Sequence, residues 1–301
     1  RPTGRRPRMA AGAPGPPPAG AAGATRDRVA DAALLPRAAA PPWPAGAPRP
    51  LEVHTVWRDP AVALVPDFLS GAEVEHLLQL AADSWQPSEV DLREAPGGAP
   101  RHATGIGQGQ LVQSAQARTS SSSLLDPGQT PTVALLEQRL ACLAGLPLEH
   151  LERLAMVRYE PGQRFAVHHD GGYRPKTVFI WKSTKGAGGE THFPVLGLRV
   201  VPRRGCAVVW SNRGPGGGDD PRLVHQGLPP TAGVKYGVNC FFNERVVRAP
   251  VAAPGLAPAA APRPRAPAVV GGRAAAWQGA TATVAPRAGL PARVLVQWPA
   301  G

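Results

Sequence analysis

The sequence predicts an α+β domain whose core is a sandwich or barrel of antiparallel strands, with a disordered segment at each end. Two observations predict the core: two segments with a helical period come first, and seven short β-forming runs separated by turn residues follow. A third observation predicts the flanks, since Ala, Pro and Gly fill 33 of residues 1–50 and 33 of residues 249–301. Such segments cannot bury enough apolar surface to offset the entropy of ordering. We therefore expect a folded domain at 51–248.

Charge is divided in the same way. The 301 residues carry a formal net charge of +12, of which the two flanks hold +11, so the predicted domain carries only +1. Basic chains often bind nucleic acid, but here the charge belongs to the flanks and we expect no nucleic acid at the core. Three widely spaced cysteines predict neither a disulfide framework nor a Cys-based zinc site. No apolar run is long enough to span a membrane. The Ala- and Arg-rich, acid-poor N-terminus resembles an organelle transit peptide.

The elements of the domain follow in order. Residues 61–66 are predicted to form a strand, and a helix is predicted from Ser70 to Trp85, because Ser70 and Glu73 make a capping box before an apolar face. Residues 86–130 are typical of loop with short strands. A second helix is predicted between Pro131, which suits a first helical position, and Gly145. The later β-like runs are 154–159, 165–170, 177–181, 191–193, 206–210, 224–226 and 235–242.

One of these runs carries a metal-binding pattern. In Val-His-His-Asp at 167–170, the strand period of two places His168 and Asp170 on one face and turns His169 to the other. A histidine and a carboxylate are two-thirds of the 2-His-1-carboxylate triad of non-heme Fe(II) oxygenases. His225, which lies in a later β-like run, is the candidate for the third ligand. Lys235 begins the last run and could meet a carboxylate of a cosubstrate.

Several motifs in this order resemble the prolyl 4-hydroxylase-like branch of the 2-oxoglutarate/Fe(II) oxygenases. They are Arg-Thr-Ser-Ser at 118–121, Arg-Tyr-Glu-Pro-Gly-Gln-Arg-Phe at 158–165, Gly-Gly-Glu-Thr-His-Phe-Pro at 188–194 and His-Gln-Gly-Leu-Pro at 225–229, with Gly233, Lys235 and Asn239 following. The resemblance covers roughly 61–244 and is densest over 154–244. It implies a double-stranded β-helix, or jelly-roll, core with the triad at one open end.

The resemblance also implies cofactors and site residues. Fe(II) would be held by His168, Asp170 and His225, and 2-oxoglutarate would be bound by Lys235, Tyr159 and Thr177. Decarboxylation of 2-oxoglutarate to succinate and CO2 would then accompany hydroxylation of a substrate by dioxygen, with ascorbate as reductant. The substrate implied is proline in a peptide or protein. The resemblance also makes the secretory pathway a candidate location, so the compartment stays open.

Two departures from the family concern the pocket and the substrate. Trp181 stands where members usually have Tyr, so the 2-oxoglutarate pocket is expected to differ there. Only residues 171–173 separate Asp170 from Arg174, where many peptide-acting members have a long loop. In peptidyl-prolyl members the Arg at that position lies beside the peptide, so Arg174 is a candidate substrate contact.

Other interpretations remain open at this stage. The histidines could pack in the core beside a surface Asp170, and Lys235 and Arg174 could be ordinary surface charges. The same cofactor chemistry could act on a free amino acid, another small metabolite or an alkylated base. A non-catalytic binding module with this fold is a further alternative, which the complete triad and Lys235 disfavour.

Overall fold

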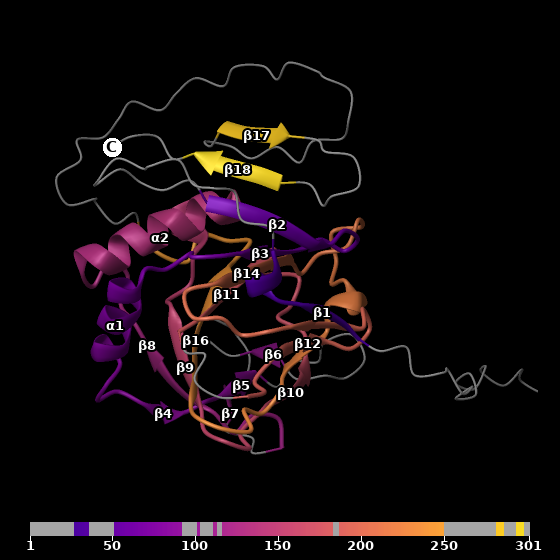
Figure 1. Cartoon of the computed structure of the whole chain (residues 1–301). Helices are drawn as coiled ribbons and strands as arrows, with labels where there is room; N and C mark the ends of the chain where they lie inside the picture. Colours follow the sequence, from indigo (N-terminus) through magenta and orange to yellow (C-terminus); the bar gives the residue numbers. More distant parts are fainter. Residues whose placement is uncertain are drawn as a thin grey trace, which may run out of the picture.

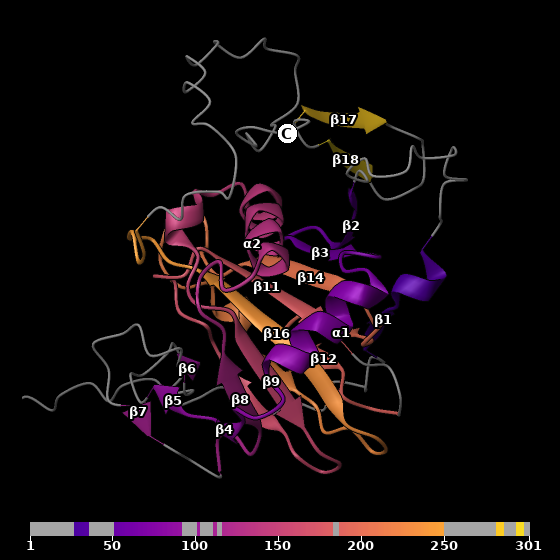
Figure 2. The ribbon, with the colours of Figure 1, turned by 90° about the vertical axis from the view of Figure 1, so that its left-hand side faces the viewer.

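The fold was analysed in a computed structural model, which describes residues 27–35, 51–91, 101–102, 111–112, 116–182, 187–249, 281–285 and 293–297. Two β-sheets face each other, and two helices cover the outer face of the larger sheet (Figures 1 and 2). Within the described residues the α+β class and the jelly-roll core are confirmed. No helix among these residues is long and apolar enough to cross a membrane.

The strands fall into three sheets. The large sheet has the order β17 (Thr281–Ala285), β18 (Arg293–Gln297), β2 (Leu51–Trp57), β3 (Val62–Val65), β14 (Ala207–Ser211), β11 (Lys176–Trp181), β16 (Lys235–Phe242), β9 (Ala155–Tyr159), β8 (Ser121–Leu124) and β4 (Gln86–Pro87). The facing sheet has the order β1 (Arg28–Ala30), β13 (Leu198–Val200), β12 (Thr191–Phe193), β15 (His225–Gly227) and β10 (Phe165–His168). A small sheet contains β6 (Arg101–His102), β5 (Val90–Asp91) and β7 (Leu111–Val112).

The helices begin and end where their capping residues predict. Helix α1 (Gly71–Leu80) starts with the capping box of Ser70 and Glu73, and α2 (Pro131–Ala144) ends at Gly145, whose φ of 67° is the left-handed conformation that glycine adopts readily. Helix α1 ends five residues before the predicted Trp85, which still packs against the same core. Three short 3-10 turns complete the set: η1 (Ala32–Leu34), η2 (Leu148–His150) and η3 (Pro221–Leu223).

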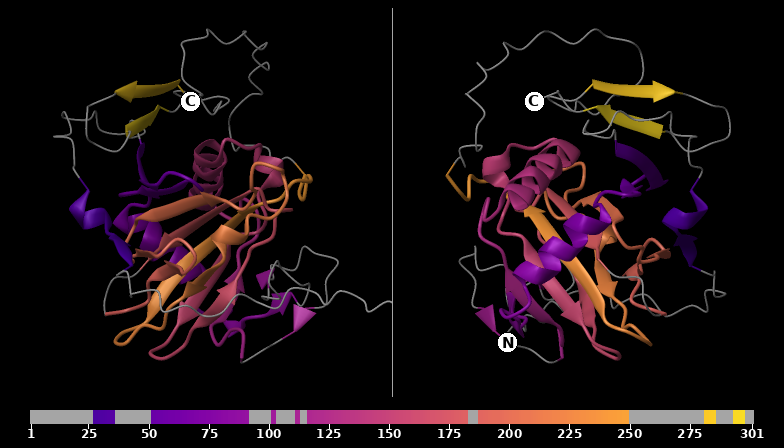
Figure 3. Two further views of the ribbon diagram at one scale, coloured as in Figure 1. Left: turned by 90° about the vertical axis from the view of Figure 1, so that its right-hand side faces the viewer. Right: turned by 60° about the vertical axis from the view of Figure 1, so that its left-hand side comes forward.

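The large sheet separates two cores. Side chains alternate along β11, so Val178 joins Leu77 of α1 in an outer core beneath the helices. Phe179 points the other way and joins Phe193 of the facing sheet in an inner core. Figure 3 shows both helices on one side of the sheet and the smaller sheet on the other. The candidate site lies against this inner core, where His168 stacks on Phe165 and His225 lies beside Phe193.

Short stretches of both predicted flanks take part in the sheets. Strand β1 pairs in parallel with β13, and Ala30 and Ala32 are buried. Asp27 accepts a hydrogen bond of 2.6 Å from Arg199, and Asp31 pairs with Arg203. In the C-terminal flank β18 pairs with β17 and with β2. The average composition of the flanks did not reveal β1 and β18, because β13 and β2, the strands with which they pair, lie far away in the sequence. The remaining flank residues lie outside the described part.

Two inner segments also differ from the prediction. Strands β2 and β13 were not predicted. The β2 segment does show the strand period of two, because Leu51 and Val53 lie on the same buried face. Strand β10 ends at His168, so Asp170 lies beyond the strand, in the turn that follows it. The predicted strand over 165–170 is therefore two residues too long.

Candidate metal centre

Three predicted ligands meet beside the inner core. His168 ends β10 and His225 begins β15, and the two residues are direct partners across this antiparallel pair. Asp170 follows in the turn. One ligand atom from each of the three residues lies within 4.8 Å of the others. His168 Nε2 is 3.7 Å from Asp170 Oδ1, and His225 Nε2 is 3.6 Å from Asp170 Oδ2. All three side chains are buried.

Hydrogen bonds fix the tautomers of the two imidazoles. His168 Nδ1 lies 2.8 Å from the carbonyl of Ala166, and His225 Nδ1 lies 3.0 Å from the carbonyl of Leu223. A carbonyl only accepts, so each Nδ1 must carry a proton, and Nε2 is the ring atom that each histidine turns toward Asp170. Burial, reinforced by the neighbouring His225, lowers the pKa of His168 well below its usual value. The ring is therefore neutral, as a metal ligand must be.

The carboxylate of Asp170 supplies a direct test of whether a cation fits. Its Oδ2 accepts a hydrogen bond of 2.7 Å from the Thr177 hydroxyl. Its Oδ1 is buried and receives no hydrogen bond from the described residues. A buried carboxylate oxygen without a donor is costly, and a bound cation would remove that cost. Two imidazoles and one carboxylate on one side of a metal are the donor set of non-heme Fe(II) sites.

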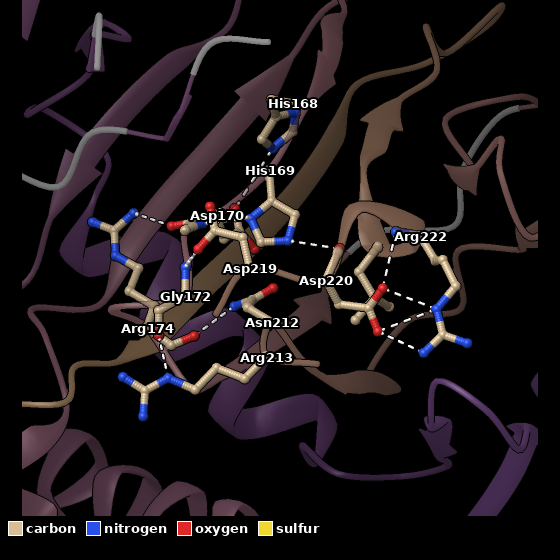
Figure 4. A network of polar contacts seen from close by, with 12 residues as sticks. His168, His169, Asp170, Gly172, Arg174, Asn212, Arg213, Asp219, Asp220 and Arg222 are labelled. Atoms are coloured by element: carbon tan, nitrogen blue, oxygen red, sulfur yellow. Dashed lines mark hydrogen bonds and ion pairs between the residues drawn. The ribbon is translucent and has the colours of Figure 1, made fainter. Parts of the chain in front are cut away.

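His169 points away from these ligands. The amide of Gly171 donates to its Nδ1 at 2.9 Å, and its Nε2 donates to the carbonyl of Asp220 at 3.1 Å, so both ring nitrogens are engaged by backbone (Figure 4). The same turn is held by Asp219, which accepts from the amide of Gly172. This histidine therefore ties the loop before η3 to the metal-binding turn.

Lys235 lies in the inner core with its stem against Gly189. A Cβ at Gly189 would lie 3.1 Å from Lys235 Cδ, and the φ of this glycine is +77°. Lys235 is 6% exposed, and its Nζ is 5.1 Å from the ring centre of Tyr159 and 5.3 Å from that of Phe179. No described carboxylate lies within ion-pair distance of Nζ. Burial lowers the pKa of Lys235 to about 7, against a smaller opposite effect of Glu190.

Tyr159 and Thr177 have partners that the sequence did not reveal. Tyr159 lies opposite Lys235 in the β9–β16 register and shares a hydrogen bond with the buried Arg118. Arg118 in turn lies over the ring of Phe165, 4.6 Å from its centre. Thr177, predicted to contact 2-oxoglutarate, instead donates its hydroxyl to Asp170. This hydrogen bond makes Thr177 a support of the metal ligand.

The inner face of β11 continues past Thr177 with Phe179 and Trp181. The Trp181 ring meets Phe179 edge-on at 5.5 Å, and its Nε1 is buried with no hydrogen-bond acceptor among the described residues. The indole therefore fills the interior beside Phe179, the ring over which Lys235 lies.

The predicted substrate contact of Arg174 is contradicted by its position. The side chain is 1% exposed, and its Nε and Nη2 donate to the two carboxylate oxygens of Glu152 at 2.9 and 2.8 Å. Its Cζ lies 4.2 Å from the ring centre of Phe241. Burial disfavours the charge, but Glu152 outweighs it and raises the pKa of Arg174. The short turn after Asp170 directs this guanidinium into the core, where it is structural.

Breaking this ion pair should strongly destabilise the fold. We expect Glu152→Gln to lower the free energy of unfolding by about 3–5 kcal/mol, because it leaves the Arg174 charge buried without its counter-ion. Asp126→Asn is the matched control: it removes the ion pair of Arg153 and Asp126, whose side chains are 37% and 73% exposed, and should cost less than about 1 kcal/mol. Urea denaturation of both variants measures the difference. Equal, small losses would contradict the structural role of Arg174.

The chain is similar in sequence to known proteins over about two thirds of its length. No family model matches the sequence. It is 28% identical over 220 residues to prolyl 4-hydroxylase 5 of Arabidopsis thaliana, covering 64% of this chain and 71% of the plant protein. It is 30% identical over 208 residues to prolyl 4-hydroxylase subunit alpha-2 of Gallus gallus, covering 65% of this chain and 36% of the chicken protein. The crystal structure of the viral collagen prolyl hydroxylase of Paramecium Bursaria Chlorella virus-1 aligns with a TM-score of 0.45 and 20% identity, over 60% of this chain and 94% of that one.

Fold, site and sequence relatives together define the class of protein. A jelly-roll core with a buried His-Asp-His cluster beside it is the arrangement of Fe(II)- and 2-oxoglutarate-dependent dioxygenases, a class of oxidoreductases. Within that class, the sequence relatives that the chain matches over more than two hundred residues are prolyl 4-hydroxylases.

Proposed function

We propose that the protein hydroxylates proline in peptides or proteins, with Fe(II) held by His168, Asp170 and His225. One observation carries the proposal: two imidazoles and a carboxylate oxygen without a donor converge within 4.8 Å, in the same interior as a buried lysine. When bound, Fe(II) and 2-oxoglutarate supply the oxidising chemistry, in which 2-oxoglutarate becomes succinate and CO2 and the substrate gains a hydroxyl group from dioxygen.

The residues of the chain bind and orient. The triad of His168, Asp170 and His225 would hold the iron on one side and leave the other side to the cosubstrate and dioxygen. Lys235 would pair with the distal carboxylate of 2-oxoglutarate, and the aromatic rings of Tyr159 and Phe179 around it keep water away from that pair. The hydrogen bond from Arg118 holds the Tyr159 hydroxyl in place beside this pocket. Ascorbate would serve as the reductant that keeps the iron in the Fe(II) state.

The affinity for 2-oxoglutarate should depend on the charge of Lys235. The pKa of Lys235 is lowered to about 7, so the lysine is charged below that pH and neutral above it. Since the carboxylate binds the ammonium, affinity should be constant below about pH 7 and weaken by up to tenfold per pH unit above it, until the raised pKa of the bound state is reached. Titrations of the Co(II)-saturated protein with 2-oxoglutarate between about pH 6 and pH 9 measure this. Lys235→Met, the control, should lose the pH dependence; affinity that rises with pH would contradict the assignment.

The substrate is tested with a panel of compounds. Proline-rich peptides, free proline and small metabolites are incubated with Fe(II), 2-oxoglutarate and ascorbate, and the products are analysed by mass spectrometry. A peptide that gains one oxygen atom on proline supports the proposal, which rests for its substrate on the prolyl 4-hydroxylases that the chain resembles. Oxidation of a small metabolite with no change in any peptide would replace the substrate and keep the cofactor chemistry.

A further inference from the structure

Four buried side chains form an unbroken hydrogen-bonded chain that ends on Asp170. Trp210 Nε1 donates to Asn212 Oδ1 at 2.9 Å, and Asn212 Nδ2 donates to Thr177 Oγ1 at 2.8 Å. Thr177 Oγ1 then donates to Asp170 Oδ2 at 2.7 Å. Each of the four side chains is at least 97% buried. Asn212 also donates to the carbonyl of Arg174 at 2.8 Å (Figure 4).

The chemistry of the groups fixes the direction of every bond. An indole N–H can only donate, so the atom of Asn212 that faces Trp210 must be its amide oxygen. The amide nitrogen must then face Thr177 and Arg174, and it can only donate. Because the Thr177 oxygen accepts from Asn212, its single proton is left for Asp170. No other assignment of protons satisfies all four side chains. The Trp210 N–H therefore sets the donor-to-acceptor direction of every hydrogen bond down to Asp170.

We propose that this relay selects Asp170 Oδ1 as the metal-binding atom and holds the carboxylate in the orientation that the iron requires. The inference rests on the proposed metal site. Both oxygens lie near a ligand histidine, Oδ1 near His168 and Oδ2 near His225, but Oδ2 already accepts the Thr177 hydroxyl while Oδ1 has no donor. Thr177 and Asn212 are therefore positioning residues: neither contacts the metal, and both act through the carboxylate. Partners of this kind commonly change metal affinity by about 10–100-fold when they are removed.

Replacement of Thr177 tests the last bond of the relay. Thr177→Val keeps the shape and removes the hydroxyl, and should weaken Co(II) binding by about 10–100-fold and alter the visible absorption spectrum of the bound Co(II). Thr177→Ser restores the hydroxyl and should return both close to wild type. Ser211→Ala, which removes a neighbouring hydroxyl bonded to the carbonyl of Arg213, is the control and should change neither. Thermal unfolding of the metal-free variants separates loss of stability from loss of metal binding.

Asn212→Asp tests the direction of the relay. The two side chains have the same shape, but a carboxylate cannot donate, so the Thr177 proton would turn from Asp170 to residue 212. The relay therefore predicts weaker Co(II) binding in Asn212→Asp. Electrostatics alone predicts the opposite, because the substitution adds a negative charge near a divalent cation. When Asn212→Asp is combined with Thr177→Val, the Co(II) affinity should fall little below that of Thr177→Val alone, because the hydrogen-bonded relay is already broken.

The outcomes separate the relay from the metal site itself. A wild-type protein that binds neither Co(II) nor Fe(II) overturns the proposed function. A wild-type protein that binds Co(II), with Thr177→Val binding equally well or Asn212→Asp binding more tightly, overturns the relay and leaves the metal site in place.

Discussion

His168→Ala is expected to abolish Fe(II) binding and all release of succinate, whereas His169→Ala is expected to keep both. The two residues are adjacent and both are buried, but their side chains point to opposite sides. His168 presents Nε2 to Asp170, while His169 uses both ring nitrogens on backbone groups of the turn. Removal of His168 leaves two protein ligands, too few for the facial triad of a non-heme iron site.

The two variants also differ in how they should affect the fold. His169→Ala leaves the amide of Gly171 without its acceptor and loosens the contact with Asp220, so we expect a loss of about 1–3 kcal/mol in stability with metal affinity retained. Iron content after reconstitution, succinate release and thermal unfolding are measured on both proteins. Equal loss of iron from the two variants would show that the assignment of the two histidines is wrong.

Lys235→Ala is expected to raise the apparent KM for 2-oxoglutarate at least tenfold while leaving iron binding nearly unchanged. Lys235 has no acidic partner among the described residues, and its Nζ lies between two aromatic rings, so a bound carboxylate would be its counter-ion. Removing one partner of such a buried pair typically costs about 2–5 kcal/mol, and about 1.4 kcal/mol corresponds to a factor of ten. The triad is a separate set of residues, which is why the metal should remain.

Two further variants isolate the charge from the packing. Lys235→Met keeps an unbranched apolar stem and should be nearly as impaired as Lys235→Ala. Lys235→Arg restores the charge and should recover part of the loss, because the guanidinium differs in length and shape from the ammonium. The close contact of Gly189 with the lysine stem limits that recovery. An unchanged KM in Lys235→Ala, measured by titrating 2-oxoglutarate in a succinate-release assay, would remove this residue from the pocket.

The helices and most inner strands could be predicted because their signals are local. Ser70 and Glu73 are three residues apart, and the cap of α2 at Gly145 needs only the residues beside it. The metal-site candidates could be identified from the sequence because His168 and Asp170 are neighbours and the surrounding motifs occur in a fixed order. Local patterns of this kind depend on covalent geometry and period, which the sequence states directly.

The errors concern contacts between residues far apart in the chain. The β1 segment is held by Asp27 and Arg199, 172 positions apart, so averaged composition could not reveal it. Arg174 could be predicted to lie near the site, but its partner Glu152 comes from a different part of the chain. Asn212 carries no motif at all; its role depends on the meeting of β14, β11 and the metal-binding turn. Such pairings follow from the tertiary fold, which pattern alone does not specify.

The central claim is that the buried triad and Lys235 support Fe(II)- and 2-oxoglutarate-dependent oxidation, and succinate release tests it most directly. Purified protein is incubated with 2-oxoglutarate, Fe(II), ascorbate and the proline-rich peptides, and succinate is quantified together with hydroxyproline. The wild-type protein should form the two products in equal amounts, and His168→Ala should form neither. Hydroxyproline formed at the same rate without Fe(II) or 2-oxoglutarate, or by His168→Ala, or no succinate from the iron-loaded wild-type protein with any substrate, would contradict the claim.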